Sequence, residues 1–155
     1  MQEKTLEIKY QITSINDLTD KDKTLVSSAK QAMVNSYSPY SKFRVGASVL
    51  LSNGLIIQGS NQENVAYPSG LCAERVSMFA AKSAYPKEKI TSLAIVSQNQ
   101  AGENTQTFPC GACLQVAAEY EANQEQNIRI IVQKNSNDVY IFDSVKCLLP
   151  FGFEF

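Results

Sequence analysis

Three of the four cysteines lie in two short motifs that are far apart in the sequence, so the fold must bring these motifs together if they form one site. The chain has no histidine, and the motifs are Cys72-Ala73-Glu74-Arg75 and Pro109-Cys110-Gly111-Ala112-Cys113. Three thiolates can hold a zinc ion and leave its fourth position to water, whose protons a nearby carboxylate can move. The sequence therefore predicts a hydrolytic zinc site with Cys72, Cys110 and Cys113 as ligands and Glu74 as the catalytic residue.

The composition is typical of a globular protein that acts on a small molecule. We expect a single domain over residues 1–155. The chain has 14 basic and 15 acidic residues, and nucleic-acid binders usually carry a basic excess, so we expect no nucleic-acid partner. No segment has the roughly 20 apolar residues that span a bilayer, and the N-terminus lacks the apolar core of a signal peptide. We therefore expect no membrane partner and a cytoplasmic protein, in which disulfides are rare.

Hydrophobic patterning predicts strands and helices in alternation. Strands are expected over 6–12, 45–51, 55–58, 90–96, 128–132 and 139–142, and helices over 20–37, over 72–84 and from the second cysteine motif to 122. Residues 1–20 form an N-terminal extension whose strand should be an added edge strand. This order predicts an α/β fold with a mixed sheet between helices. Both cysteine motifs then lie at helix N-termini, where the helix dipole stabilises thiolates.

The residues of this predicted site also have simpler interpretations. A CxxC motif can be a redox dithiol, but such a motif normally lies near a βαβ unit, whereas this one follows a long polar loop. A structural zinc site needs a fourth protein ligand, and Cys147 is better interpreted as a small buried residue. Glu74 could simply complement the helix dipole. We interpret Arg75 as a cation that compensates the charge of three thiolates around one zinc ion.

The motifs resemble those of the small, homotetrameric, zinc-dependent cytidine deaminases. The resemblance runs from about residue 25 to residue 153, and its motifs occur in the family order over 38–47, 59–64, 67–75, 109–113 and 148–153. It implies a three-layer α/β/α fold with a mixed five-stranded sheet. The N-terminal extension would add its edge strand to this sheet.

The resemblance also implies roles for residues outside the cysteine motifs. Asn61 and Glu63 match residues that hold the ribose 3′-hydroxyl, and Phe43 matches an aromatic residue of the nucleoside pocket. Further substrate contacts are implied for Ala73, Tyr40, Tyr67 and Phe153, of which the tyrosines also match the subunit interface. Phe153 matches a residue that reaches the base in a neighbouring subunit. The resemblance thus implies a homotetramer with shared active sites.

The implied reaction is zinc-dependent hydrolytic deamination of cytidine and 2′-deoxycytidine to uridine and 2′-deoxyuridine, with release of ammonia, in pyrimidine salvage. A blasticidin-type or other aminopyrimidine nucleoside deaminase is an alternative with the same fold. A zinc-stabilised binding module and a CxxC oxidoreductase are alternatives from other classes. Neither of these two has a use for a sugar-binding loop at Asn61 and Glu63.

Overall fold

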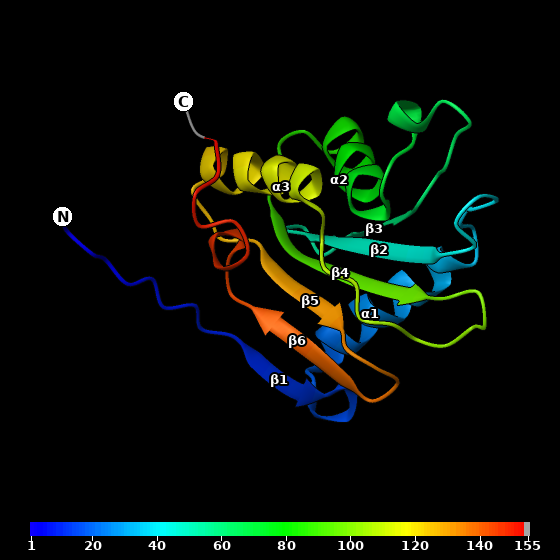
Figure 1. Cartoon of the computed structure of the whole chain (residues 1–155), viewed down its shortest axis with the longest axis horizontal. Helices are drawn as coiled ribbons and strands as arrows, with labels where there is room; N and C mark the ends of the chain where they lie inside the picture. The colour runs from blue at the N-terminus through cyan, green and yellow to red at the C-terminus, as the bar shows by residue number, and fades with distance from the viewer. Residues whose placement is uncertain (154–155) are drawn as a thin grey trace.

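A six-stranded mixed sheet with helices on both faces forms the fold (Figure 1), in a computed structural model that describes residues 1–153. The strand order is β1-β6-β5-β4-β2-β3, in which β4 and β5 are parallel and the other neighbours are antiparallel. The strands are β1 (Gln11–Ser14), β2 (Arg44–Leu51), β3 (Ile56–Ser60), β4 (Ile90–Gln98), β5 (Arg129–Gln133) and β6 (Asp138–Phe142). The helices are α1 (Asp20–Met33), α2 (Ala73–Ala84) and α3 (Gly111–Asn123). The predicted α/β fold with helix layers around a mixed sheet is confirmed, with six strands in place of five because β1 is added at one edge.

The N-terminal strand begins later than the alternating pattern predicts. The strand was expected over 6–12, but β1 covers Gln11–Ser14 and pairs with β6 from Ile141 back to Asp138. Because β6 ends at Phe142, the chain before Gln11 runs past the end of its partner strand and has no ladder to join. Residues 1–10 therefore extend from the sheet without secondary structure (Figure 1).

Each face of the sheet has its own hydrophobic core. On one face α1 packs through Leu25, Val26 and Ala29 against side chains of β4, β5 and β6. This helix was expected to continue to residue 37, but it ends at Met33 and Tyr37 instead donates a backbone hydrogen bond to Asn61. The opposite face is covered by α2 and α3, whose buried residues pack against the alternate side chains of the same strands. The helices that carry the cysteine motifs thus share one face.

Two glycines allow the helices to approach the sheet closely. A Cβ at Gly59 of β3 would lie 2.4 Å from the Ser77 nitrogen and 2.5 Å from the Ala73 oxygen, both backbone atoms of α2. A Cβ at Gly46 of β2 would lie 2.0 Å from the Ala29 oxygen of α1, on the opposite face. Gly59 therefore fixes the distance between the sheet and the first turns of α2, which follow Cys72.

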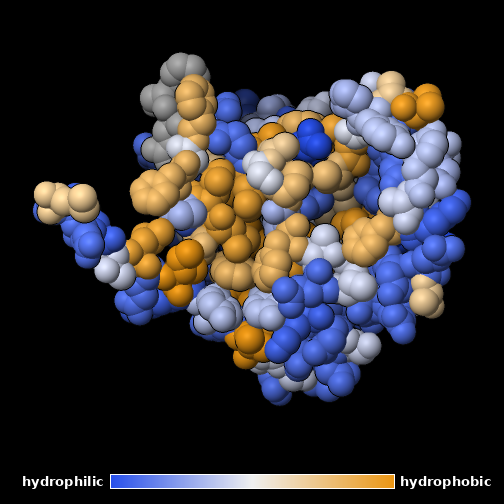
Figure 2. All heavy atoms as spheres, viewed as in Figure 1, coloured by the Kyte–Doolittle hydropathy of each residue, from blue (hydrophilic) through white to orange (hydrophobic). Residues whose placement is uncertain are grey.

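The surface toward the viewer in Figure 2 carries an apolar region over the middle of the molecule, around β5 and β6. Its aromatic part consists of Tyr10, Phe108, Tyr140 and Phe142, whose ring centroids lie 5.4–6.5 Å apart in the pairs that contact one another. Within residues 1–153, no helix combines the length and the apolar character that a membrane crossing requires.

Candidate active site

The structure brings the three predicted cysteine ligands together where two helices begin. Cys72 is the N-cap of α2, Cys110 is the N-cap of α3, and Cys113 lies in the first turn of α3. The Sγ atoms are 3.8 Å apart for Cys72 and Cys110 and 3.5 Å apart for Cys110 and Cys113, and all three lie within 4.8 Å of one another. Zinc–sulfur bonds of about 2.3 Å in a tetrahedral site place the sulfurs about 3.8 Å apart. The donor set therefore fits a zinc ion.

Arg75 and the two helix N-termini make the surroundings of the sulfurs electropositive. The Arg75 guanidinium donates to Cys72 Sγ at 3.8 Å. The pKa of the Cys72 thiol is lowered to about 5, first because Cys113 donates a hydrogen bond to it and then because of the Arg75 hydrogen bond. The pKa of Cys113 is raised, since its thiol donates that hydrogen bond and is buried. Arg75 thus contacts a thiolate, as charge compensation requires.

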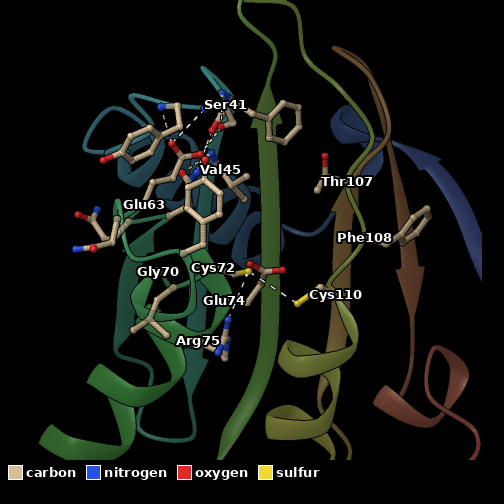
Figure 3. A pocket seen from close by; sticks show the side chains of 17 residues that line it. Ser41, Val45, Glu63, Gly70, Cys72, Glu74, Arg75, Thr107, Phe108 and Cys110 are labelled. Carbon is tan, nitrogen blue, oxygen red and sulfur yellow. Dashed lines mark hydrogen bonds between the residues drawn. The ribbon is translucent and has the colours of Figure 1, made fainter.

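Glu74 is a buried carboxyl group beside the sulfur cluster. Its side chain belongs to the first turn of α2, is only 3% exposed, and in Figure 3 lies between Cys72 and Cys110 with its carboxyl group turned into the pocket. Burial raises the pKa of Glu74 to about 7, and the negative charge of Cys72 adds to this effect. A carboxyl group with a pKa near neutrality can both accept and release a proton at physiological pH.

A pocket of about 710 Å³ opens above Glu74, Cys72 and Cys110. This volume lies within the range of about 300–1,000 Å³ that is typical of small-molecule sites. The cysteines and Glu74 line one end, while Glu63 and Ser41 lie at the other end (Figure 3). The pocket thus has a proton-transfer group at one end and a polar group at the other.

The residues at the polar end are held by hydrogen bonds to the loop before β2 and to the start of β2. The carboxylate of Glu63 accepts from the backbone nitrogens of Tyr40 at 2.9 Å and Ser41 at 3.2 Å, and from the Ser41 hydroxyl. The Ser41 hydroxyl bond is the main reason why the pKa of Glu63 is lower than usual. The Asn61 side chain accepts from the Val45 nitrogen and donates to the Phe43 oxygen, both at 2.9 Å. Both side chains therefore have fixed orientations at the pocket wall.

Of the other predicted substrate contacts, three line the pocket and two do not. Phe43, Tyr40 and Tyr67 line it, and the rings of the two tyrosines meet edge to face with centroids 6.1 Å apart. Ala73 is fully buried in the first turn of α2 and does not line the pocket. Phe153 lies away from the pocket of its own chain, and its backbone exchanges two hydrogen bonds with the Gln115 side chain, at 2.9 and 3.0 Å.

Three residues that line the pocket were not predicted from the sequence, namely Thr107, Phe108 and Val45. All three residues line the pocket, and Figure 3 shows Thr107 and Phe108 across from the Glu63 side. Thr107 and Phe108 end the polar loop that leads to Cys110. Their position directly before the second cysteine motif could have indicated that they lie near the site, because residues next to a ligand in the chain also lie near it in space.

Comparisons with known proteins agree with this site. The sequence model described as "Cytidine and deoxycytidylate deaminase zinc-binding region" matches residues 19–126. A cytidine deaminase of Halalkalibacterium halodurans is 40% identical over 95 residues, which cover 61% of this chain and 68% of that protein.

Solved structures show the same likeness at the level of the fold. The crystal structure of cytidine deaminase from Burkholderia pseudomallei matches with a TM-score of 0.74 and 31% identity, over 88% of this chain and 100% of that chain. The cytidine deaminase structure from Mycobacterium tuberculosis matches with a TM-score of 0.68 and 31% identity, over 88% of this chain and 99% of that chain. The matched region contains both cysteine motifs and Glu74. The chain therefore belongs to the cytidine deaminase family of hydrolases.

Proposed function

We propose that the protein hydrolyses the 4-amino group of cytidine and 2′-deoxycytidine, giving uridine or 2′-deoxyuridine and ammonia, with zinc as its cofactor. The observation that carries this proposal is the position of Glu74. Its carboxyl group is buried, has a pKa raised to about 7, and lies beside three clustered sulfurs at the end of a pocket of suitable size for a nucleoside. The family membership supports the same reaction.

The cofactor would be held by Cys72, Cys110 and Cys113, whose spacing fits tetrahedral zinc. When bound there, zinc would lower the pKa of a water molecule toward about 7 and so make a nucleophile available at neutral pH. Arg75 offsets the excess negative charge of three thiolates through its contact with Cys72. Since an arginine stays protonated at all relevant pH values, this compensation does not depend on pH.

Glu74 performs the proton transfers in this proposal. It takes a proton from the attacking water and delivers it to N3 of the cytosine ring, which makes C4 electrophilic. It then takes the second proton of that water and gives it to the 4-amino group, which leaves as ammonia while the oxygen stays on C4. A raised pKa suits this repeated exchange, because the same group must be a base in one step and an acid in the next.

Glu63 and Asn61 position the nucleoside for this reaction. The lowered pKa of Glu63 keeps its carboxylate ionised, so it can accept a hydrogen bond from the ribose 3′-hydroxyl. One N–H of the Asn61 amide is used by the Phe43 oxygen, and the other can donate to the same sugar. Phe43 lines the pocket as an apolar wall for the base. Holding C4 near the nucleophile makes an encounter between two molecules effectively unimolecular.

We further propose a cytoplasmic homotetramer that acts in pyrimidine salvage and shares its active sites between subunits. Phe153 supports this arrangement, since its side chain is 67% exposed and lies outside the pocket of its own chain. Gln115 of α3 fixes the backbone at Phe153, which would hold the ring in place for a neighbouring subunit. The four free cysteines are consistent with a reducing compartment.

The decisive experiment measures ammonia release from cytidine by the purified protein, with the zinc content per chain determined before and after chelation. We expect turnover to follow the zinc content and to return when zinc is added back. A panel that includes 2′-deoxycytidine, free cytosine and blasticidin S defines the substrate, and free cytosine should react poorly because it lacks the sugar. One bound zinc ion per chain without ammonia from any of these compounds would refute the proposal.

A further inference from the structure

Residues 1–10 form an extended N-terminal arm whose apolar side chains are largely exposed. The arm precedes β1 and the matched family region, which begins at residue 19. Leu6 is 56% exposed, Ile8 is 45% exposed and Tyr10 is 54% exposed, and the arm points away from the body of the molecule (Figure 1). Alternation of apolar and polar residues is typical of a strand with one covered face. In residues 1–153, the arm has the pattern of such a strand but no partner strand.

The apolar side chains of the arm belong to the same face of the sheet as the aromatic cluster. Ile12 lies opposite Tyr140 in the ladder between β1 and β6, and directly opposed residues project to the same face. Tyr10 stacks on Phe142 with ring centroids 5.6 Å apart. Side chains alternate along a strand, so Leu6 and Ile8 continue this face when the arm is extended. The arm would thus lengthen the apolar surface that Figure 2 shows around β6.

The outer edge of β1 is also available for pairing. β1 is the last strand at its side of the sheet, and no described strand pairs with its outer edge. Free edges of this kind invite pairing with another chain, and proteins often prevent it with charges on the edge. The arm carries such charges, but their signs alternate: Glu3 and Lys4 are adjacent, and Glu7 and Lys9 lie two residues apart.

We propose that the arms of two copies of this chain pair as antiparallel strands across a two-fold axis at Ile8. In this register Glu7 of each copy lies opposite Lys9 of the other, so the interface contains two complementary charge pairs. Ile8 lies opposite Ile8 and Leu6 opposite Tyr10, so apolar side chains meet on one face. Such an isologous interface uses the same surface on both copies.

The neighbouring registers conflict with the sequence of the arm. A shift of the axis to residue 7 places Glu7 opposite Glu7, and a shift to residue 9 places Lys9 opposite Lys9. Like charges directly opposite each other are destabilising in a strand pair. A register offset by one residue puts apolar side chains opposite polar ones and so on the wrong face. The register centred on Ile8 satisfies both conditions and also pairs Glu7 with Lys9. An axis at Tyr10 leaves both of these charges opposite uncharged residues, and an axis at Leu6 places Ile8 opposite Lys4.

The position of the axis also leaves room for two bodies. Ile8 lies three residues before Gln11, where the pairing with β6 begins, and the arm there stands clear of the body (Figure 1). At about 3.4 Å per residue, this offset is about 10 Å. Partner residues 4 and 5 would lie opposite Ile12 and Gln11. Each sheet thereby gains the partner's arm as a strand along the free edge of β1.

A cysteine scan of the arm tests this register. We expect Ile8→Cys to form a covalent dimer under mild oxidation with oxidised glutathione, and mass spectrometry should identify a disulfide that joins position 8 of one copy to position 8 of the other. Thr5→Cys is the matched control, since residue 5 is also exposed but lies opposite Gln11. The unsubstituted protein controls for the native cysteines. Equal dimer formation by the two variants, or none by Ile8→Cys, would overturn the proposal.

A charge exchange gives an independent measurement that does not depend on oxidation. Glu7→Lys and Lys9→Glu each replace two attractive pairs with two repulsive ones. In sedimentation experiments we therefore expect the step of association that deletion of residues 2–10 removes to weaken roughly tenfold or more, whereas association through the proposed tetramer contacts should stay unchanged. The double exchange restores both pairs and should restore association. All three variants should show unchanged circular dichroism. The pairing of the arms would be contradicted if the double variant did not regain association, or if deletion of residues 2–10 left association unaffected.

Discussion

Substitution of Gly59 by alanine should disturb the candidate metal site, because Gly59 packs against the first turns of α2, the helix that begins directly after Cys72. The new Cβ would lie 2.4 Å from the Ser77 nitrogen and 2.5 Å from the Ala73 oxygen, whereas ordinary contacts begin at about 3.4 Å. Both atoms belong to the backbone of α2, so relief requires that the start of this helix moves by about 1 Å. Overpacking of this kind costs about 1–3 kcal/mol of unfolding free energy.

The same movement displaces Cys72, which directly precedes Ala73, relative to the two sulfurs on α3. Metal–ligand distances tolerate deviations of only about 0.2 Å, so a shift of about 1 Å cannot be absorbed by the bonds alone. We expect zinc affinity to fall at least about tenfold, the lower end of the effect of disturbing the residues that orient metal ligands. Competition with a chromophoric chelator measures this affinity.

Two further glycine variants separate site geometry from stability. Gly46→Ala would place a Cβ 2.0 Å from the Ala29 backbone oxygen, on the other face of the sheet. This substitution should therefore lower the melting temperature and leave the zinc affinity of the folded protein unchanged. Gly111 lies between Cys110 and Cys113 in the sequence, but a Cβ at this position would meet no atom within 4 Å. For Gly111→Ala, the melting temperature and the zinc affinity should therefore both stay near those of the parent protein. If Gly59→Ala and Gly46→Ala reduce zinc affinity equally, the contact between β3 and α2 does not set the site.

Three other substitutions test the remaining parts of the structure. Glu74→Gln should retain zinc while turnover falls about 10²–10⁴-fold, the contribution of general acid–base catalysis; retained turnover with full zinc content would exclude the proton-transfer role. Glu63→Gln should raise the KM for cytidine. It should also make the free energy of unfolding depend less on pH in the acidic range, which is the acid limb of the stability curve. The pKa of Glu63 is below its usual 4.5, so its contribution to the free energy of unfolding is present above pH 4.5 and disappears as the pH falls through the lowered pKa. An unchanged acid limb would contradict the hydrogen bonds from Ser41. Asp22→Asn should cost about 2 kcal/mol of unfolding free energy, because it weakens the paired hydrogen bonds of 2.7 and 3.1 Å from Arg129 that tie α1 to β5; thermal unfolding measures this loss, with the exposed substitution Asp17→Asn as control.

The parts of the site that were predictable from sequence are those encoded in short segments. A cysteine followed by Glu74 at the start of one helix, and a CxxC motif at the start of another, define their own geometry because helix N-termini have regular positions for caps and first-turn residues. The alternating and helical patterns likewise predicted the strands and helices of the sheet. The boundaries of β2, β3 and β4 follow the predicted ranges to within about two residues, the usual uncertainty of such boundaries.

The parts that could not be predicted depend on contacts between distant segments. The N-terminal strand shows this most clearly, because its pattern extends over 6–12 but its length is set by where β6 ends. Phe108 shows the same limit, since its place in the pocket wall depends on the path of a loop without regular structure. The course of a loop depends on long-range packing and leaves no periodic pattern in the sequence.

The special character of Glu74 also arises from distant contacts. A glutamate in the first turn of a helix is common and usually solvated, where it stabilises the positive end of the helix dipole. Here the residue is only 3% exposed, and it belongs to the first turn of a helix whose backbone packs closely on β3 at Gly59. Burial is the main cause of its raised pKa, so the protonation of the proposed catalytic group depends on how the first turn of α2 is packed in the fold. Sequence reasoning could identify Glu74 by its spacing from Cys72, but the need for Gly59 becomes visible only when the helix that packs against it is known.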